Sequence, residues 1–227
     1  MGDDPGPEPA PGASLPDVDL FAGVAVRVSS LCLDGNGRLS QRLLCGTAVR
    51  GALLLDLALA GRVESAEDSV VVDPTPTGFG PADRLLAAIA VEPERSLDAW
   101  MDERRIGLRE VADANVASGR WQRRPGPFGF GRRYDDLHPD ETERDRRRLA
   151  DDAATWSPVD ACVTAVATAA ALQDLEIWVP GWRPDELLGV TGPVAWLAGA
   201  VVDHVLVTGA RYRAQAGALG AGTVGPF

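Results

Sequence analysis

Lysine is absent from this 227-residue chain, so its 22 Lys and Arg positions are all arginines. A GC-rich genome, as in many bacteria, explains this absence most simply. Arginine binds carboxylate and phosphate groups through two parallel N–H bonds, whereas lysine acts as a point charge. Any anion that the chain recognises is therefore expected to be bound by guanidinium groups.

Cysteine and histidine are also scarce, with three and two copies. Cys32, Cys45 and Cys162 form no CxxC pair, which argues against a zinc site or a disulfide framework and favours a reducing, cytoplasmic location. His138 precedes a proline and His204 lies in an apolar stretch, where a lone histidine is mostly structural. The sequence has no nucleophile elbow, P-loop, GxGxxG motif or metal-ligand cluster, so we expect a non-enzymatic protein without a cofactor.

Long apolar runs are missing as well. A helix needs about 20 apolar residues to cross a bilayer, and the best candidate, Pro193–Thr208, contains Asp203 and His204. Any membrane contact is therefore expected to be peripheral. Residues 1–16 are rich in proline, glycine and acids and lack the blocks of a signal peptide, so we expect a disordered tail there, one domain over 17–215, and a flexible tail over 216–227.

The formal net charge of −11 disfavours a general nucleic-acid binder, because such a chain repels phosphates. The charge is unevenly distributed, however. Between Arg104 and Arg148 there are twelve arginines and eight acids, whereas the remainder has ten arginines and 25 acids. An acidic body with one basic segment suits a protein that meets an anionic surface in one orientation. The same local excess of arginine would also arise if pairs of arginine and acid on the helix surfaces only kept this segment soluble.

Hydrophobic periodicity predicts a mainly α fold, a compact helical domain with short β-strands and a protruding basic β-hairpin. We expect helices over about 47–60, 81–90, 97–118, 139–151, 158–172, 184–189 and 193–214. We expect β structure over Val24–Leu33 and Ser69–Asp73, and a hairpin over 120–134. The core helix carries Leu53, Leu54 and Leu57 on one face, and Gly61 is placed to end it.

Arg50 stands in this core helix and is its most unusual residue. A guanidinium group in so apolar a segment needs an anionic partner or contact with solvent. An arginine that simply points to water is the commoner case. The sequence leaves both possibilities open.

Short motifs along the chain agree in order and spacing with one known family. They are Leu31–Leu39, Arg50–Leu59, Pro76–Gly78 with Leu85-Leu86, the arginine-bearing segment 97–118, the basic hairpin, and His138-Pro139. Over roughly residues 20–215 the chain thereby resembles the Golgi phosphoprotein 3 family, and we expect a bacterial member. The resemblance implies a peripheral membrane protein that binds phosphatidylinositol 4-phosphate.

The resemblance also implies a headgroup pocket, and each of the family's pocket positions can be matched to a residue of this chain. The arginine of the family's core helix matches Arg50, and the first basic residue of the later helix matches Arg105. The second basic residue falls on Leu108, although Arg109 is adjacent, and the family's tryptophan falls on Gln41. We therefore expect Arg50, Arg105, Arg109 and Gln41 to bind an anionic phospholipid headgroup.

The 120–134 segment contains Phe128 and Phe130 near the predicted turn of the hairpin. Four arginines flank them: Arg123, Arg124, Arg132 and Arg133. This composition suits contact with a membrane or with another subunit. The segment also resembles a hairpin through which members of the family oligomerise. Both rings could instead pack back on the body, because exposed aromatic side chains are uncommon.

Two other functions fit parts of the sequence. The first is a protein-interaction adaptor with an unknown protein partner, since eukaryotic members of the family also connect membranes to cytosolic tails and coat proteins. The second is a winged-helix-like nucleic-acid binder, whose recognition helix would offer Arg104, Arg105, Arg109 and Asn115. The net charge weighs against the second, so we expect no nucleic-acid partner.

Overall fold

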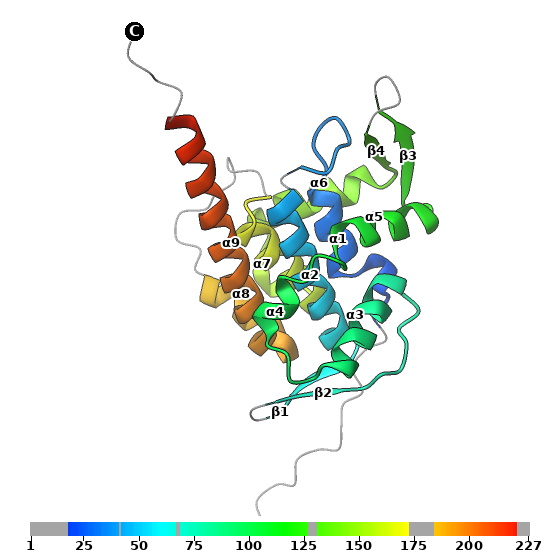
Figure 1. Cartoon of the computed structure of the whole chain (residues 1–227), viewed down its shortest axis with the longest axis vertical. Coiled ribbons are helices and arrows are strands. Elements are labelled where there is room, and N and C mark those ends of the chain that lie inside the picture. The colour runs from blue at the N-terminus through cyan, green and yellow to red at the C-terminus, as the bar shows by residue number, and fades with distance from the viewer. Residues whose placement is uncertain (1–17, 41, 67–68, 127–130, 173–183, 222–227) are drawn as a thin grey trace, which may run out of the picture.

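The computed structural model describes residues 18–40, 42–66, 69–126, 131–172 and 184–221 (Figure 1). These residues form nine α-helices and two antiparallel two-stranded sheets. The helices are α1 (Val24–Leu31), α2 (Arg42–Leu59), α3 (Gly80–Val91), α4 (Leu97–Met101), α5 (Leu108–Ala117), α6 (Pro139–Arg147), α7 (Pro158–Ala169), α8 (Pro184–Val190) and α9 (Ala195–Ala221). The expectation of a mainly α fold with short strands is confirmed.

Both sheets are single antiparallel pairs. Strand β1 (Val63–Ala66) pairs with β2 (Ser69–Val72), and β3 (Trp121–Pro125) pairs with β4 (Arg132–Asp136). Short 3-10 turns complete the described chain: η1 (Leu20–Ala22), η3 (Arg148–Ala150), η4 (Ala153–Thr155) and η6 (Gly192–Val194). The strand expected over Ser69–Asp73 is present as β2, and the hairpin expected over 120–134 coincides with the antiparallel pair β3–β4, whose second strand runs on to Asp136. Phe128 and Phe130 lie outside the described residues, so their exposure stays a prediction.

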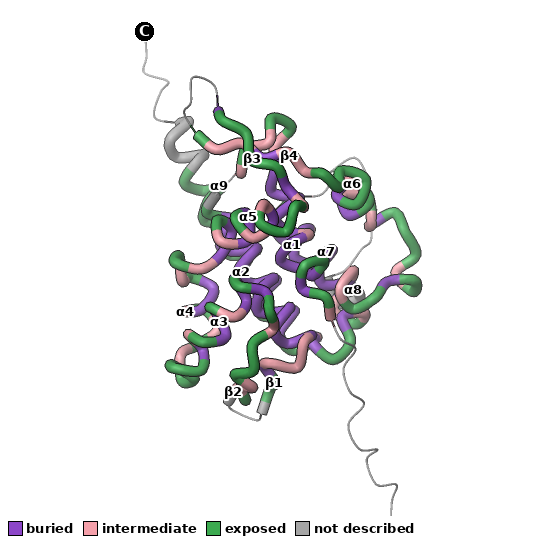
Figure 2. The backbone as a smooth tube through the Cα atoms, turned by 90° about the vertical axis from the view of Figure 1, so that its right-hand side faces the viewer, coloured by how far each residue is buried: buried purple, intermediate pink, exposed green. Residues whose placement is uncertain are grey.

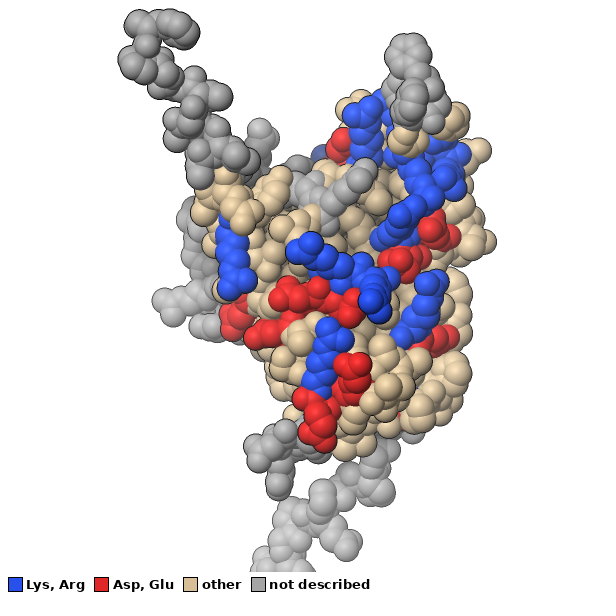
Figure 3. Space-filling view, in the orientation of Figure 1, with Lys and Arg blue, Asp and Glu red and all other residues tan. Residues whose placement is uncertain are grey.

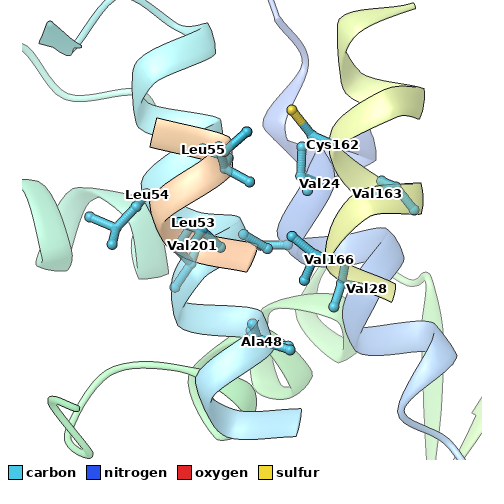
Figure 4. Packing of buried hydrophobic residues seen from close by; sticks show 14 of the residues in the cluster. Val24, Val28, Ala48, Leu53, Leu54, Leu55, Cys162, Val163, Val166 and Val201 are labelled. Carbon is cyan, nitrogen blue, oxygen red and sulfur yellow. The ribbon is translucent and has the colours of Figure 1, made fainter. Parts of the chain in front are cut away.

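Helix α2 runs through the middle of the molecule, and α1, α3, α5, α7 and α9 pack around it (Figures 1 and 2). Figure 4 shows how side chains from α1, α2, α7 and α9 meet in the core. Gly51 of α2 permits the closest approach, because a Cβ there would lie 2.4 Å from Val201 Cγ1 and 2.9 Å from Met101 Cε. A glycine at this position lets α9 and α4 pack directly on the α2 backbone.

The strand predicted over Val24–Leu33 is wrong, because this segment forms helix α1. Its first backbone N–H groups are bound by the carboxylate of Asp56 on α2: Val24 N donates to Oδ1 at 2.7 Å and Ala25 N to Oδ2 at 2.9 Å. The carboxylate caps the helix in place of a local side chain. Valine favours strands only weakly, and burial against α2 overrides this preference.

The single helix predicted over 97–118 is also wrong, because it is interrupted between Met101 and Leu108. The Met101 carbonyl accepts a hydrogen bond from Arg50 Nε at 2.5 Å instead of continuing the helix. Gly107, with a φ of +154°, then turns the chain into α5. Arg105 therefore lies in a loop and not on a helix face with Arg109.

Helix α9 is longer than the 193–214 predicted from sequence. Among the described residues one helical segment, Gly192–Gln215, is long and apolar enough to cross a membrane by length and composition. Its first half is part of the core, however, since Leu197, Val201 and Val205 are almost fully buried against the body. A transmembrane position would remove these side chains from that core.

A group of partly buried charges joins α1, α6 and α7. Arg27 donates to Asp145 from Nε at 2.9 Å and from Nη2 at 2.5 Å, and its Nη2 also donates to Asp160 at 2.8 Å. Arg148 lies 3.0 Å from Asp145 and 3.1 Å from Asp160. Burial by itself would lower the pKa of Arg27, but the hydrogen bonds and charges of the two carboxylates outweigh it and raise the pKa.

The first prediction concerns Asp56, whose pKa burial raises from 3.8 to about 7 despite its two N–H donors. A folded-state pKa above the unfolded value gives stability that is present below pH 3.8 and is lost as pH rises through about 7. Asp56→Asn should cost about 1–3 kcal/mol at pH 5, because the amide nitrogen cannot accept from an N–H. The difference in the free energy of unfolding between wild type and Asp56→Asn, measured by urea unfolding, should then narrow towards pH 8, because the wild type loses the contribution of Asp56 and asparagine does not titrate.

Asp19→Asn is the matched control, because Asp19 caps the exposed turn η1 by accepting from Phe21 N at 2.9 Å. Asparagine caps helices as well as aspartate does, so we expect a constant and small difference from wild type between pH 5 and pH 8. A wild-type minus Asp56→Asn difference that stayed constant over the same range would contradict the assignment.

The second prediction concerns Arg27. Arg27→Met should lower the free energy of unfolding by about 3 kcal/mol, because it leaves Asp145 and Asp160 with Arg148 as the one cation that pairs with them among the described residues. Arg84→Met is the control, since Arg84 is exposed on α3 and should change stability by less than about 0.5 kcal/mol. A loss below about 1 kcal/mol in Arg27→Met would show that Arg148 compensates both carboxylates alone.

Candidate functional site

A cavity of about 820 Å³ lies between the start of α2, the loop 102–107, the start of α5 and strand β4. Five arginines line it: Arg50, Arg104, Arg105, Arg109 and Arg132. Among the described residues, Glu110 is the one acid in its lining. Leu39, Leu43 and Leu108 supply apolar wall. A cavity with this excess of guanidinium groups attracts anions.

Arg50 is the buried member of this set, with an exposed fraction of 5%. Its Nε donates to the Met101 carbonyl at 2.5 Å, and its Nη2 donates to Thr47 Oγ1 at 3.2 Å. Of the described residues, none places a carboxylate oxygen within 4 Å of its guanidinium group. Arg50 is thus a buried cation held by neutral groups, facing a cavity.

Electrostatics at Arg50 follow from this burial. Burial lowers the pKa of its guanidinium group, and the charge of Arg104 adds to the lowering, while the charges of Asp102, Glu103 and Glu110 act in the opposite direction. Arginine stays protonated in proteins, so the group remains a cation whose charge is incompletely compensated. An anion in the cavity would supply the missing compensation.

Two glycines make room for the Arg50 side chain. A Cβ on Gly107 would lie 3.1 Å from Arg50 Cγ and 3.3 Å from Nη1, and a Cβ on Gly46 would lie 3.6 Å from Nη1. The guanidinium group therefore passes between the α2 backbone and the start of α5. The φ of +154° at Gly107 is a conformation that other residues rarely adopt.

The loop that carries Arg104 and Arg105 is fixed by its neighbouring acids. Arg105 N donates to Glu103 Oε1 at 3.1 Å, and this bond, together with Arg95 at 3.3 Å, holds the pKa of Glu103 below its usual value. Gly107 N donates to Glu110 Oε2 at 3.0 Å, as in a capping box. Glu110 is thus occupied by the helix start, which leaves the exposed side chains of Arg104 and Arg105 for a ligand.

The structure brings together three of the four residues expected to bind a headgroup. Arg50, Arg105 and Arg109 line the same cavity, and Leu108, the departure from the family pattern, lies in its wall. Gln41 lies outside the described residues. Whether these residues bind a headgroup stays a proposal.

The arginines expected at the hairpin are divided among different surroundings. Arg132 lines the cavity and also lies 3.5 Å from Asp113. Arg124 pairs with Asp135, and Arg123 is exposed on β3. Figure 3 shows basic side chains gathered over the β3–β4 strands and across the middle of the same face.

A second cavity, of about 650 Å³, differs in charge. Its lining combines Arg124, Arg133 and Arg146 with four acids: Asp34, Asp135, Asp136 and Glu143. The guanidinium groups there are balanced by carboxylates, so it lacks the excess of positive charge that an anion requires. The cavity around Arg50 is therefore the better candidate for an anion site.

Histidine and cysteine take structural positions. His204 Nδ1 lies 2.8 Å from Asp98 and Nε2 lies 3.3 Å from Asp102, which ties α9 to α4. Cys32, Cys45 and Cys162 are free and buried. Within the described ranges, no group of three or more His, Cys, Asp or Glu side chains is placed to hold a metal ion.

Sequence reasoning missed two of the arginines in the cavity. The sequence pattern places Arg104 within the predicted helix 97–118 and Arg132 within the predicted hairpin, and the family pattern includes neither in the headgroup pocket. The signal that could have placed Arg104 is the pair Arg104-Arg105 shortly before Gly107, because a glycine inside a helical pattern indicates an interruption. No comparable signal places β4 at the cavity.

Comparison with known families agrees with this geometry. The family model described as Golgi phosphoprotein 3 (GPP34) matches residues 31–205, a range that contains every lining residue of the cavity. A search among curated proteins finds no match. The match covers well over half of the chain and confirms the resemblance inferred from the order of its motifs. The chain therefore belongs to the Golgi phosphoprotein 3 (GPP34) family.

Proposed function

We propose that the protein binds anionic phospholipid headgroups in the cavity around Arg50 and so associates peripherally with a membrane. The observation that carries this proposal is the buried guanidinium group of Arg50, which faces the cavity without a carboxylate partner among the described residues. Arg104, Arg105 and Arg109 stand on the same wall and likewise have no ion pair within the described part of the chain. A phosphate would pair with several of them at once.

By family resemblance the ligand is phosphatidylinositol 4-phosphate. Its headgroup carries a phosphodiester and a phosphomonoester, which suits a cavity with several guanidinium groups. The apolar Leu108 stands where the family has a basic residue, so here Arg104, Arg109 or Arg132 takes over that contact. Arginine forks at different positions still offer bidentate bonds, so the chemistry of phosphate binding is retained.

The proposed protein is cytoplasmic and non-enzymatic, with the headgroup as a ligand and not as a substrate. An adaptor without lipid binding is the alternative. The two differ in one measurement, because an adaptor would bind no vesicle of any composition and would require a protein partner.

The third prediction tests the cavity by co-sedimentation with vesicles. The wild type should bind vesicles that contain phosphatidylinositol 4-phosphate or phosphatidylserine and should leave phosphatidylcholine vesicles unbound. Arg105→Ala/Arg109→Ala should lower the partition coefficient by at least about ten-fold, because each hydrogen bond to a charged group contributes about 1.5–3 kcal/mol. Both side chains are exposed and unpaired within the described residues, so folding should be unchanged.

Arg84→Ala is the matched control, since it removes an exposed arginine on α3 that lines neither cavity. Arg50→Ala/Arg105→Ala adds the buried member and should abolish binding. Equal binding by the double variants and by Arg84→Ala would refute the site. Absence of binding by the wild type on every vesicle would favour the adaptor.

The fourth prediction tests how Arg50 is positioned. Gly107→Ala should weaken binding to anionic vesicles by about ten-fold, because its Cβ would displace the Arg50 side chain and remove a charge-assisted bond. Gly119→Ala is the control at the other end of α5. Gly119 has a φ of +77° and open space around a Cβ, so it brings backbone strain alone.

Gly119→Ala should lower the free energy of unfolding by about 1–2 kcal/mol, the cost of a side chain in the left-handed region. Gly107→Ala should lower it by about 1–3 kcal/mol, because its backbone conformation is one that glycine alone adopts readily. Vesicle binding by Gly119→Ala should equal that of the wild type. If both variants lost binding equally, the effect would come from stability and not from the position of Arg50.

A further inference from the structure

The second half of α9 leaves the body of the molecule with an exposed apolar surface. Leu206 and Val207 are 40% and 48% exposed, and every residue from Ala210 to Gln215 is exposed. Only 39% of the most apolar stretch of this helix is buried. Two adjacent aliphatic side chains thus lie uncovered where the helix leaves the body, and exposed apolar surface of this kind marks sites of contact with a partner or a membrane.

The charge of this part of the chain is opposite to that of the rest. After Asp203 the sequence contains Arg211 and Arg213 and no aspartate or glutamate, although the whole chain carries a net charge of −11. Both arginines are exposed, and Tyr212 lies between them. A helical segment that combines exposed aliphatic side chains with arginines and contains no acid is attracted to an anionic bilayer surface.

The position of this surface links it to the cavity. A Cβ on Gly209 would lie 3.6 Å from Leu44 of α2, so α9 contacts α2 at this level. Leu43, the adjacent residue of α2, is 41% exposed and lines the cavity. Figure 1 shows the end of α9 and the β3–β4 pair at the same end of the molecule, and the start of α2 lies between them.

The helix cannot reach across a bilayer from this position. Its first half is held in the core by Leu197, Val201 and Val205, and its His204 is bonded to Asp98 and Asp102 of α4. The part of α9 beyond these contacts, residues 206–221, is shorter than the roughly 20 residues that a span requires. This segment suits the interface between headgroups and acyl chains.

We propose that the second half of α9 is a second membrane contact, which we call the α9 contact (Leu206, Val207, Ala210, Arg211, Tyr212 and Arg213). It inserts its aliphatic side chains among the lipids that surround the headgroup bound in the cavity. Arg211 and Arg213 bind phosphates at the surface of the bilayer while their stems cover apolar area. This inference rests on the proposed headgroup binding and adds an apolar component to it.

Val207→Glu tests the α9 contact, with Val91→Glu as the matched control. Both valines are exposed on helices, at 48% and 80%, and Val91 ends α3, outside both cavities. Val207→Glu should lower partition onto phosphatidylserine vesicles by about ten-fold or more, since a buried aliphatic contact is replaced by a charge. Val91→Glu should partition as the wild type does.

Titration with soluble inositol 1,4-bisphosphate separates this inference from the proposed function. Val207→Glu should bind it with the affinity of the wild type, because the cavity is intact, whereas Arg105→Ala/Arg109→Ala should lose both this binding and vesicle binding. If Arg105→Ala/Arg109→Ala changed neither the binding of inositol 1,4-bisphosphate nor the binding to vesicles, the proposed headgroup site would be wrong. Unchanged vesicle partition by Val207→Glu would overturn the α9 contact alone.

A fluorescent label gives an independent measurement of insertion. The native cysteines Cys32, Cys45 and Cys162 are buried, so a nitrobenzoxadiazole label should react selectively at Val207→Cys or Val91→Cys. Anionic vesicles should shift the emission of the label at position 207 to the blue and leave position 91 unchanged. A smaller mass for Val207→Glu than for the wild type in light scattering, with no blue shift, would assign this face to contact between copies and overturn the proposal.

Discussion

The hydrogen bond from Arg50 Nε to the Met101 carbonyl is the interaction on which the cavity depends. It holds the guanidinium group against the end of α4 and leaves the following loop to carry Arg104 and Arg105 back beside α2. Gly46 and Gly107 provide the space in which the side chain lies. A buried cation is thus held by neutral dipoles, and its charge remains available to a ligand.

Carboxylates elsewhere in the molecule are used within the fold. Asp56 caps α1, and Asp145 and Asp160 compensate Arg27 and Arg148. In the cavity five arginines face one acid among the described lining residues, Glu110, so the excess of acids in the composition does not extend to it. The distribution of pairs, and not the net charge, decides where an anion can bind.

Membrane binding would combine two kinds of interaction: electrostatic contacts in the cavity and apolar contacts at α9. Contacts between guanidinium groups and phosphate are selective for anionic lipids and are weakened by salt. Insertion of aliphatic side chains depends little on which lipid headgroup is present. A protein with both would bind anionic membranes more tightly than either part permits. Leu43, which lies in the cavity wall and next to a residue that contacts α9, connects the two surfaces.

The sequence by itself determined the family, the helical class, and the helices whose signals are local, such as α7 with Ser157 and Pro158 at its start. It also marked Arg50, Arg105 and Arg109 through the family pattern. Only the tertiary structure decided that Val24–Leu31 is a helix, because its cap, Asp56, lies more than 30 residues away. It likewise decided the break after Met101 and the presence of Arg104 and Arg132 in the cavity, since the bond from Arg50 and the packing of β4 join segments far apart in the chain. Local preferences amount to less than about 1 kcal/mol per residue, and burial and long-range hydrogen bonds exceed them.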